Sequence, residues 1–406
     1  MDALRKMLVE ELKQPSVEEN YVEIVERKGL GHPDSICDSI VNEASIALSK
    51  EYIKRAGMVL HHNLDKGLLA AGEVEARFGG GVVKKPMLMV FGDRATFNVD
   101  GDVIPVEDIV VKAAKDWIRR KLRFVDPEHH IRYQVEIKMG SEALTDIFKR
   151  SKGILGANDT SAAVGYAPMT RTEKLVLEVE KYVNSPEFKR SYPETGEDVK
   201  VMGFREGDKL NLVMAMAFVD RFIASESEYF RRKAEVLQEI KGFLMSKSEG
   251  FSEINLSLNV LDREGRGING VYLTVLGTSA DGADCGQVGR GNRVNGVIPL
   301  NRPISSEAAA GKNPVSHVGK IYNILSHVIA QEVYDKVQGI KEVYVWLLSR
   351  IGEPIDQPMV VASQVILQPG YTYKDVEREI REIIEVRLDN IRSFCEDLAW
   401  GRINIY

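Results

Sequence analysis

The chain has 406 residues, of which 44% are hydrophobic and 28% charged, and its formal net charge is −6 at pH 7. This length predicts two or three domains of roughly 100–200 residues each, and the acidic balance argues against a nucleic-acid-binding protein, which is normally basic. Three scattered cysteines (Cys37, Cys285 and Cys395) argue against a disulfide framework, and no apolar run approaches the roughly 18 residues of a membrane span. The charged N-terminus has no apolar signal region, so we expect a cytoplasmic protein with no membrane partner.

Helical and alternating hydrophobic patterns predict the elements in chain order. The predicted helices span residues 3–13, 33–48, 106–122, 170–184, 225–244, 314–333, 376–388 and 391–398. The predicted strands span residues 21–26, 68–78, 86–91, 132–139, 210–219, 254–260, 271–276, 343–348 and 359–366. Charges on the exposed strand faces fit α+β layers better than a doubly wound parallel sheet. Strands followed by a long helix recur about three times, which suggests a threefold repeat, although no repeat is visible residue by residue.

The turn between the first predicted strand and the next helix reads Gly31-His32-Pro33-Asp34. Proline suits the first turn of a helix, and Asp34 and Asp38, four residues apart, share one helix face. Asp34 could serve only to stabilise the positive N-terminus of the helix. The functional alternative is that His32 and Asp34 face a ligand at the start of the helix.

Residues 153–165 form a segment rich in glycine, asparagine and aspartate, including Gly156-Ala157-Asn158-Asp159. Segments of this composition often form surface loops that carry function. We predict a mobile loop or lid here.

The stretch from Gly277 to Lys312 has a glycine every few residues over its first half. Glycine destabilises a helix interior by about 1 kcal/mol and packs nothing in a strand, so the stretch predicts an irregular segment. Its backbone N–H groups and cations could meet a polyanion, and we therefore expect a phosphate-rich ligand, with an ordinary surface loop as the alternative. The candidate groups in this stretch are Asp281, Asp284, Arg290, Arg293 and Lys312.

The familiar nucleotide and hydrolase motifs are missing from the sequence. Gly311-Lys312 lacks the earlier glycine of a Walker A motif, and Gly289-Arg-Gly291 lacks the third glycine of a Rossmann motif. No histidine pair has companions at zinc-ligand spacing, and no nucleophile elbow is present. What remains is phosphate chemistry without a P-loop. Further candidate cations are Lys200, His317 and Lys320, and possible Mg²⁺ ligands are Asp34, Asp38, Asp281 and Asp284.

Together the motifs resemble S-adenosylmethionine synthetases, in the same order along nearly the whole chain. The motifs are Gly31-His32-Pro33-Asp34, Lys66-Gly67 running into Gly72-Glu73, Gly156-Ala157-Asn158-Asp159, Asp198-Val199-Lys200, Asp284-Cys285-Gly286-Gln287-Val288-Gly289-Arg290 and Gly311-Lys312-Asn313-Pro314. Their fuller forms are similar to the archaeal branch of methionine adenosyltransferases. The resemblance implies that ATP and L-methionine give S-adenosylmethionine, with triphosphate leaving whole and then being cut to pyrophosphate and phosphate. The sulfur nucleophile carries no proton, so no general base is expected.

The resemblance also implies roles for matching residues. His32 would donate to the leaving oxygen or its phosphate, and Asp34 would bind Mg²⁺. Glu73, Asp284 and Ser141 would hold methionine, and Asp159 would lie in a gating loop. The triphosphate would be held by Lys200, Arg290 and Lys312, with Arg293, His317 and Lys320 nearby.

Three positions depart from the bacterial pattern of the family. Gly291 stands where the bacterial forms have a lysine. His317 and Gly319 stand near a bacterial lysine and a Mg²⁺-binding aspartate, so Asp281 or Asp38 is predicted to supply the second metal carboxylate. The bacterial K⁺-binding glutamate falls near His62, which leaves a K⁺ requirement weakly supported.

The fold that the resemblance implies has three similar subdomains about a pseudo-threefold axis, spanning residues 1–140, 141–250 and 251–406. Mixed or antiparallel sheets would pack at a homodimer interface that contains the active sites, with a tetramer left open. Two other functions are compatible with the residues alone: a Mg²⁺-dependent phosphoryl-transfer enzyme or NTPase without a P-loop, and a non-catalytic polyanion-binding oligomer.

Overall fold

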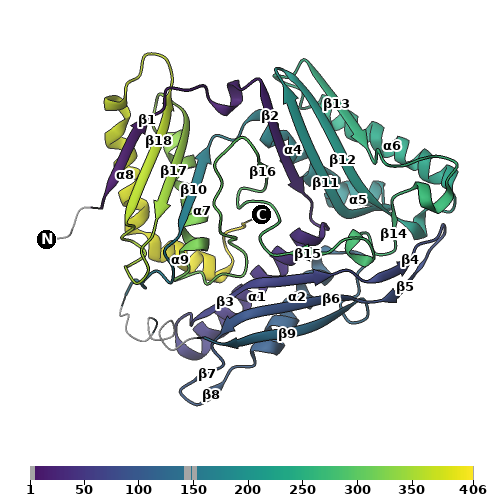
Figure 1. Cartoon of the computed structure of the whole chain (residues 1–406), viewed down its shortest axis with the longest axis horizontal. Coiled ribbons are helices and arrows are strands. Elements are labelled where there is room, and N and C mark those ends of the chain that lie inside the picture. The colour runs from purple at the N-terminus through teal and green to yellow at the C-terminus, as the bar shows by residue number, and fades with distance from the viewer. Residues whose placement is uncertain (1–4, 141–147, 149–152, 406) are drawn as a thin grey trace.

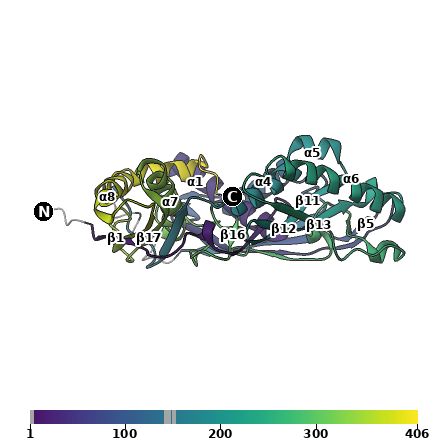
Figure 2. The ribbon, with the colours of Figure 1, turned by 90° about the horizontal axis from the view of Figure 1, so that it is seen from above.

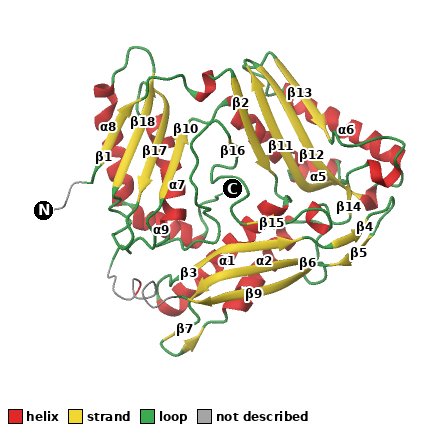
Figure 3. Cartoon of the chain, in the orientation of Figure 1, coloured by secondary structure: helices red, strands yellow, loops and turns green. Residues whose placement is uncertain are grey.

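The structure is a computed structural model that describes residues 5–140, 148 and 153–405. Within these residues, three large β-sheets lie towards one side of a flat molecule, and the long helices cover their other side (Figures 1 and 2). The coexistence of mixed and antiparallel sheets with separate helical layers confirms the predicted α+β class (Figure 3).

Each sheet is best followed by its strand order. The first sheet runs β1 (Met7–Glu11), β18 (Val360–Leu367), β17 (Ile340–Leu348) and β10 (Ala162–Ala167). The second runs β13 (Glu253–Leu258), β12 (Lys209–Val219), β11 (Thr195–Glu206), β2 (Val22–Lys28) and β16 (Ile298–Pro299), with β14 (Leu273–Thr274) also pairing with β12. The third runs β15 (Gly286–Gln287), β3 (His62–Ala70), β6 (Met87–Ala95) and β9 (Ile131–Met139). Two small two-stranded sheets are also present. β4 (Glu73–Glu75) pairs with β5 (Val82–Lys85), and β7 (Asn98–Val99) pairs with β8 (Asp102–Val103).

The helices form one apolar core with each sheet. The first sheet is backed by α7 (Val318–Lys336), α8 (Tyr373–Asp389) and α9 (Ile391–Trp400). The second is backed by α4 (Arg171–Val183), α5 (Pro186–Ser191) and α6 (Glu226–Met245). The third is backed by α1 (Pro33–Ala56) and α2 (Val106–Lys121). No helix in the described part of the chain is long and apolar enough to cross a membrane.

Strands far apart in the sequence pair with one another. β2 pairs antiparallel with β11, β10 pairs antiparallel with β17, and β1 pairs parallel with β18. The sheets therefore exchange strands across residues 140 and 250, where the sequence predicts domain boundaries. The three-part division stays a prediction, and any such subdomain would combine separate stretches of the chain.

The helix predicted over residues 3–13 is wrong where the structure describes it. Met7–Glu11 is the edge strand β1, which pairs in parallel register with β18 from Met7↔Val361 to Glu11↔Val365. Met7 and Val9 face the core beside α8, while Leu8 is exposed. A five-residue stretch of apolar and acidic residues is compatible with both the helical and the strand periodicity. Pairing with β18 determines that it forms a strand.

Three other predicted elements have different bounds in the structure. The strand predicted over 68–78 divides into β3 and β4, because the chain turns at Gly72, where an added Cβ would lie 2.5 Å from the Lys85 carbonyl oxygen. The strand predicted over 271–276 shortens to Leu273–Thr274. Residues 162–165 of the predicted lid belong to the buried strand β10, so only residues 153–161 form a loop in this region.

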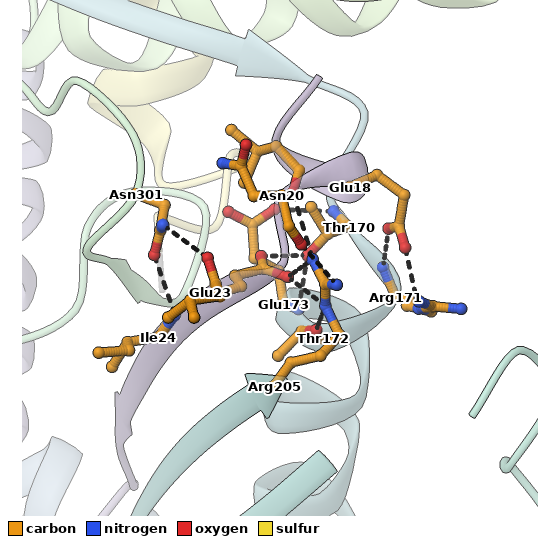
Figure 4. A network of polar contacts seen from close by, with 12 residues as sticks. Glu18, Asn20, Glu23, Ile24, Thr170, Arg171, Thr172, Glu173, Arg205 and Asn301 are labelled. Carbon is orange, nitrogen blue, oxygen red and sulfur yellow. Dashed lines mark hydrogen bonds and ion pairs between the residues drawn. The ribbon is translucent and has the colours of Figure 1, made fainter. Parts of the chain in front are cut away.

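A buried ion pair fixes β2, the strand that leads to His32 (Figure 4). Arg205 on β11 donates from Nε and Nη2 to Glu23 Oε2 at 3.0 and 2.9 Å, and Thr170 Oγ1 donates to Glu23 Oε1 at 2.6 Å. Arg205 also donates to Thr172 Oγ1 on α4 at 3.0 Å. Because a buried charge is tolerated only when it is paired and hydrogen-bonded, this network holds β2, β11 and α4 in one arrangement.

Candidate functional site

The His32 turn lies where β2 passes into α1. Gly31 donates to the Glu197 carbonyl at 2.8 Å, and a Cβ on Gly31 would lie 2.5 Å from the Asp198 nitrogen, so only glycine fits. His32 caps α1, with its Nδ1 accepting from the Asp34 N–H at 3.2 Å. Burial lowers the pKa of His32 to about 4. The neutral ring therefore carries its proton on Nε2, which leaves an N–H donor.

A cavity of about 500 Å³ brings together the His32 turn and groups from five other segments. Its lining includes the polar side chains of His32, Asp198, Lys200 and Asp284, and also Leu261 and Tyr272. Three of these polar groups are sequence-predicted site residues. Asp198 was not among the predicted site residues, although its signal was present in the Asp198-Val199-Lys200 motif.

Two buried carboxylates shape the first turn of the glycine-rich segment. Asp198 Oδ2 accepts from the Ser279 N–H at 2.8 Å and from Ser279 Oγ at 2.5 Å. Asp281 Oδ2 accepts from the Val275 and Leu276 N–H groups at 2.8 and 2.9 Å. Burial raises the pKa of Asp198 to about 6 and that of Asp281 to about 7. Asp281 does not line the cavity beside His32, so its predicted role as a metal ligand gains no support from this geometry.

The next part of the segment packs on the N-terminus of α1. The Gln287 N–H donates to Asp34 Oδ1 at 2.9 Å, and the Gly289 N–H donates to Asp38 Oδ1 at 2.8 Å. Burial raises the pKa of Asp38 to about 7. A Cβ on Gly291 would lie 2.2 Å from Asp38 Oδ2. This contact gives a physical reason for glycine at the position where the bacterial pattern has lysine.

The two arginines of this segment, Arg290 and Arg293, lie in different environments. Arg290 is exposed and its carbonyl accepts from Lys28 Nζ at 2.6 Å, while Arg293 is half-buried and donates from Nη2 to the Gly289 carbonyl at 3.4 Å. Lys28 also donates to Asp34 Oδ2 at 2.9 Å. Lys28 was not among the predicted site residues, because in the sequence it is an ordinary charged residue at the end of a strand.

A second polar cluster surrounds Lys312 at the N-terminus of α7. The buried Lys312 ammonium pairs with Asp65 and with Glu307 Oε2, the latter at 3.0 Å. Burial opposes the ionisation of Asp65, but Lys312 outweighs it and holds the pKa of Asp65 well below its usual range. His317 caps α7 through Nδ1, which accepts from the Gly319 N–H at 3.2 Å.

Buried basic groups complete the second cluster. Burial lowers the pKa of Lys320 to about 7 and that of His317 to about 3, and Lys312 adds to both shifts. Lys320 Nζ donates to Asn42 Oδ1 on α1 at 2.9 Å. Anion binding suits such a cluster, because a helix N-terminus and nearby ammonium groups favour negative charge.

The first cluster, which comprises the groups around His32, Asp34 and Asp38, and the second cluster, around Lys312, both contact α1. Asp34 and Asp38 on α1 face the first cluster, and Asn42 faces the second. The cavity beside His32 is not lined by Lys312, His317 or Lys320.

The remaining predicted residues lie outside the cavity. Glu73 on β4 is exposed and pairs with Lys85. Asp159 is half-buried, and its Oδ1 accepts from the Thr160 N–H at 2.7 Å. Ser141 lies outside the described residues.

The fit of the site to Mg²⁺ depends on Asp34 and Asp38. Among the described residues, no group of three or more histidine, cysteine, aspartate or glutamate side chains could hold a metal ion. Mg²⁺ commonly takes only one or two carboxylates and completes its shell with water and substrate phosphate. Asp34 and Asp38 do not line the cavity beside His32 and already accept from Lys28, Gln287 and Gly289, so a Mg²⁺ ion at this helix start would take most of its ligands from water and substrate phosphate.

The fold and the two clusters define an α+β protein in which lysine and arginine side chains and a neutral histidine lie near the N-termini of α1 and α7. The sequence pattern of the S-adenosylmethionine synthetase (AdoMet synthetase) family matches residues 5–402, and the chain belongs to this family.

Named relatives agree with this assignment. The chain is 45% identical over 405 residues to the S-adenosylmethionine synthase of Thermococcus onnurineus, covering 99% of each chain. It is 45% identical to that of Pyrococcus furiosus and 44% identical to that of Methanocaldococcus jannaschii, in each case covering 99% of this chain and 100% of the relative. The fold is also similar to the solved structure of an unusual S-adenosylmethionine synthetase from Campylobacter jejuni, with a TM-score of 0.54 at 14% identity, over 94% of this chain and 93% of that one.

Proposed function

We propose that this chain synthesises S-adenosylmethionine from ATP and L-methionine. The methionine sulfur forms a bond to C5′ of ATP while the bond from C5′ to the triphosphate oxygen breaks, and the triphosphate is then hydrolysed to pyrophosphate and phosphate. The sulfur loses no proton, so catalysis rests on alignment of the reacting atoms and on stabilisation of the departing charge. Membership of the family, with named relatives at 43–45% identity over 99% of the chain, supports this reaction.

The observation that carries the mechanism is the neutral His32 in the cavity. Its Nδ1 is engaged by the Asp34 N–H, so the ring can donate only from Nε2. A neutral N–H donor can hydrogen-bond to the negative charge that develops on the leaving oxygen. No proton has to be transferred to His32 before the reaction begins. Lys200 and Asp284 line the same cavity, which supports contacts of these side chains to the triphosphate and to the methionine ammonium group.

The triphosphate is proposed to contact Lys200, Arg290 and Lys312, with Arg293 and Lys320 adding positive charge and the neutral His317 offering a ring N–H donor. Lys312 lies in the second cluster, away from the cavity beside His32. A second copy that brings its own Lys312 cluster to the first copy's His32 would place both clusters on one substrate. We therefore propose a homodimer with shared sites, and a further pairing of dimers stays open.

Methionine is proposed to be held by Glu73 and Asp284, with Ser141 as a further contact. Glu73 is exposed on β4, and Gly72 beside it donates to the Ala280 carbonyl at 3.0 Å, which places β4 next to the glycine-rich segment. Asp159 is proposed to belong to a gating loop of residues 153–161.

Mg²⁺ bound to phosphate oxygens, with Asp34 and Asp38 as the protein ligands, would neutralise part of the triphosphate charge. A K⁺ requirement has little support, because both ring nitrogens of His62 already have partners: Ser45 Oγ at 2.8 Å from Nε2 and the Leu60 carbonyl at 3.1 Å from Nδ1.

The sheet faces opposite the helices support the proposed dimer. They carry exposed apolar side chains on strands of all three sheets, namely Leu8, Leu68, Phe204 and Val213. Apolar patches of this kind favour contact with another protein surface. Three sheets, each backed by helices, also suit subdomains related by a pseudo-threefold axis.

The experiment that tests the function is incubation of the full chain with ATP, L-methionine and MgCl₂, followed by chromatography of the nucleotides and assay of pyrophosphate and phosphate. S-adenosylmethionine in equal amount to the pyrophosphate is the expected result. The appearance of ADP, or ATP consumption without S-adenosylmethionine, would instead indicate a phosphoryl-transfer enzyme. A chain that binds nucleotide with no turnover would indicate a polyanion-binding protein.

A further inference from the structure

Two lysines face each other across the strand pair that ends at the His32 turn. Lys28 on β2 and Lys200 on β11 are direct partners in the antiparallel register. Opposed residues in such a pair project from the same face of the sheet, and like charges placed opposite each other destabilise the pairing. One carboxylate serves both ammonium groups, since Glu26 Oε1 lies 3.9 Å from Lys28 Nζ and 3.4 Å from Lys200 Nζ.

The Lys28 side chain is held in place by the groups that surround the proposed substrate. Its Nζ donates to Asp34 Oδ2 at 2.9 Å and to the Arg290 carbonyl at 2.6 Å. Only 11% of the Lys28 side chain is exposed, compared with 43% of Lys200. The ammonium group therefore lies between the start of α1 and the glycine-rich segment, and its charge is little screened by water.

Lys200 lines the cavity beside His32, and its strand partner Lys28 reaches Asp34, two residues after His32. A purely structural role would explain the pair that Lys28 makes with Asp34. It would not explain a second ammonium group directly opposite, which shares Glu26 with Lys28 and lines the same cavity as His32.

We infer that Lys28 is a further phosphate-binding residue, which together with Lys200 holds the oligophosphate leaving group beside His32. The inference rests on the proposed function, because that reaction supplies the oligophosphate. An anion placed between the two ammonium groups relieves their electrostatic repulsion. The repulsion that destabilises the free chain is therefore removed on binding, which increases the affinity for the ligand. The Arg290 carbonyl contact also places the Arg290 segment against the same anion.

The test is titration calorimetry of the full chain with inorganic tripolyphosphate, with and without MgCl₂. Lys28→Gln keeps a side-chain N–H donor for Asp34 and the Arg290 carbonyl but removes the charge, and Lys28→Arg keeps the charge. Lys209→Gln is the matched control, because Lys209 lies on β12 of the same sheet and pairs with Glu253 at 3.6 Å.

We expect Lys28→Gln to weaken tripolyphosphate binding by about tenfold, as for loss of one charge-assisted contact. The slope of log Kd against log salt concentration should also fall, because one fewer cation meets the anion. Lys28→Arg should stay within about threefold of the unmodified chain, and Lys209→Gln should match it. A folded Lys28→Gln chain with unchanged affinity and salt slope would overturn the inference, as would equal losses in the Gln and Arg variants. If Lys28→Gln does not fold, Lys28→Met, which removes the charge and keeps the length of the side chain, is titrated in its place and judged by the same loss of affinity and of salt slope.

These outcomes separate the inference from the proposed function. If S-adenosylmethionine forms but Lys28→Gln binds tripolyphosphate normally, the role of Lys28 is wrong and the reaction stands. If no S-adenosylmethionine forms while Lys28→Gln loses affinity, the anion site stands and the reaction is wrong.

Discussion

Replacing His32 by Asn tests the neutral donor in two independent ways. Asparagine is also a good N-cap residue, so α1 should still begin at Pro33. Burial lowers the pKa of His32 from 6.5 to about 4. A group with a depressed basic pKa binds more protons in the unfolded chain than in the folded chain between these two values, so the folded state loses stability as the pH falls from about 6.5 to about 4.

The size of this loss follows from the shift. Two and a half pKa units correspond to about 3 kcal/mol, of which about 2 kcal/mol is lost by pH 5. Urea unfolding at pH 7.5 and pH 5 should therefore show that the unmodified chain loses about 2 kcal/mol more than His32→Asn over this interval. His129→Asn is a suitable control, because His129 is exposed and its pKa is raised by Asp126. Equal losses in the unmodified and His32→Asn chains would refute a buried, neutral His32.

The same variant addresses catalysis. The asparagine side chain ends short of the position of His32 Nε2, so its amide N–H does not replace the histidine donor, and loss of one donor to a developing negative charge typically lowers kcat by about 10²–10³-fold. Steady-state rates of S-adenosylmethionine formation should fall by this amount in His32→Asn, while the Kd for methionine changes little. A kcat within twofold of the unmodified chain would show that His32 does not contact the leaving group.

Three further changes test other parts of the site. Gly291→Ala places a Cβ 2.2 Å from Asp38 Oδ2 and should destabilise the chain by about 1–3 kcal/mol with at least a tenfold loss of turnover, whereas Gly242→Ala, with open space around its Cβ, should be neutral or stabilising in urea unfolding. Asp65→Asn leaves the buried Lys312 without its main partner and should lower the free energy of unfolding by about 3–5 kcal/mol, and an unchanged unfolding midpoint would show that the pair is not formed. EDTA should abolish turnover and MgCl₂ should restore it without shifting the melting temperature of the ligand-free chain; a large shift would reveal a metal site made by protein alone.

Most long elements were predictable because their signals are local. The helix predicted over 106–122 is α2 at Val106–Lys121, and that predicted over 170–184 is α4 at Arg171–Val183, where Thr170 and Glu173 form a capping box. The helix predicted over 3–13 failed because the choice of strand is made by β18, more than 350 residues away. Pairing between distant strands leaves no periodic signal in the sequence.

The same limit explains which site residues were found. His32, Asp284 and Arg290 lie in motifs that read continuously, and the structure gathers them at the start of α1. Lys28 and Asp198 gain their importance from contacts with segments about 80 to 260 residues away. Their residue types alone match those of many ordinary strand residues.

Gly291 and Gly319 depart from the bacterial pattern. They show how this site can retain charges of the same sign by supplying them from other residues. A Cβ on Gly291 would meet Asp38 Oδ2, and a Cβ on Gly319 would lie 2.9 Å from Lys312 Cε and 3.2 Å from Glu307 Cβ. Neither position has room for the charged side chain expected from the bacterial forms.

A charge of the same sign lies close to each glycine, on another part of the chain. Lys28 Nζ reaches the carbonyl of Arg290, the residue before Gly291, and Glu307 Oε2 reaches Lys312 beside Gly319. If these are true replacements, Gly291→Lys should not rescue Lys28→Gln, because Asp38 blocks the new side chain. The quantity to measure is tripolyphosphate affinity without MgCl₂, because Asp38 is also a proposed metal ligand. Rescue of this affinity only when Asp38 is also shortened to Ala would show that steric room, and not the charge requirement, separates this site from the bacterial pattern.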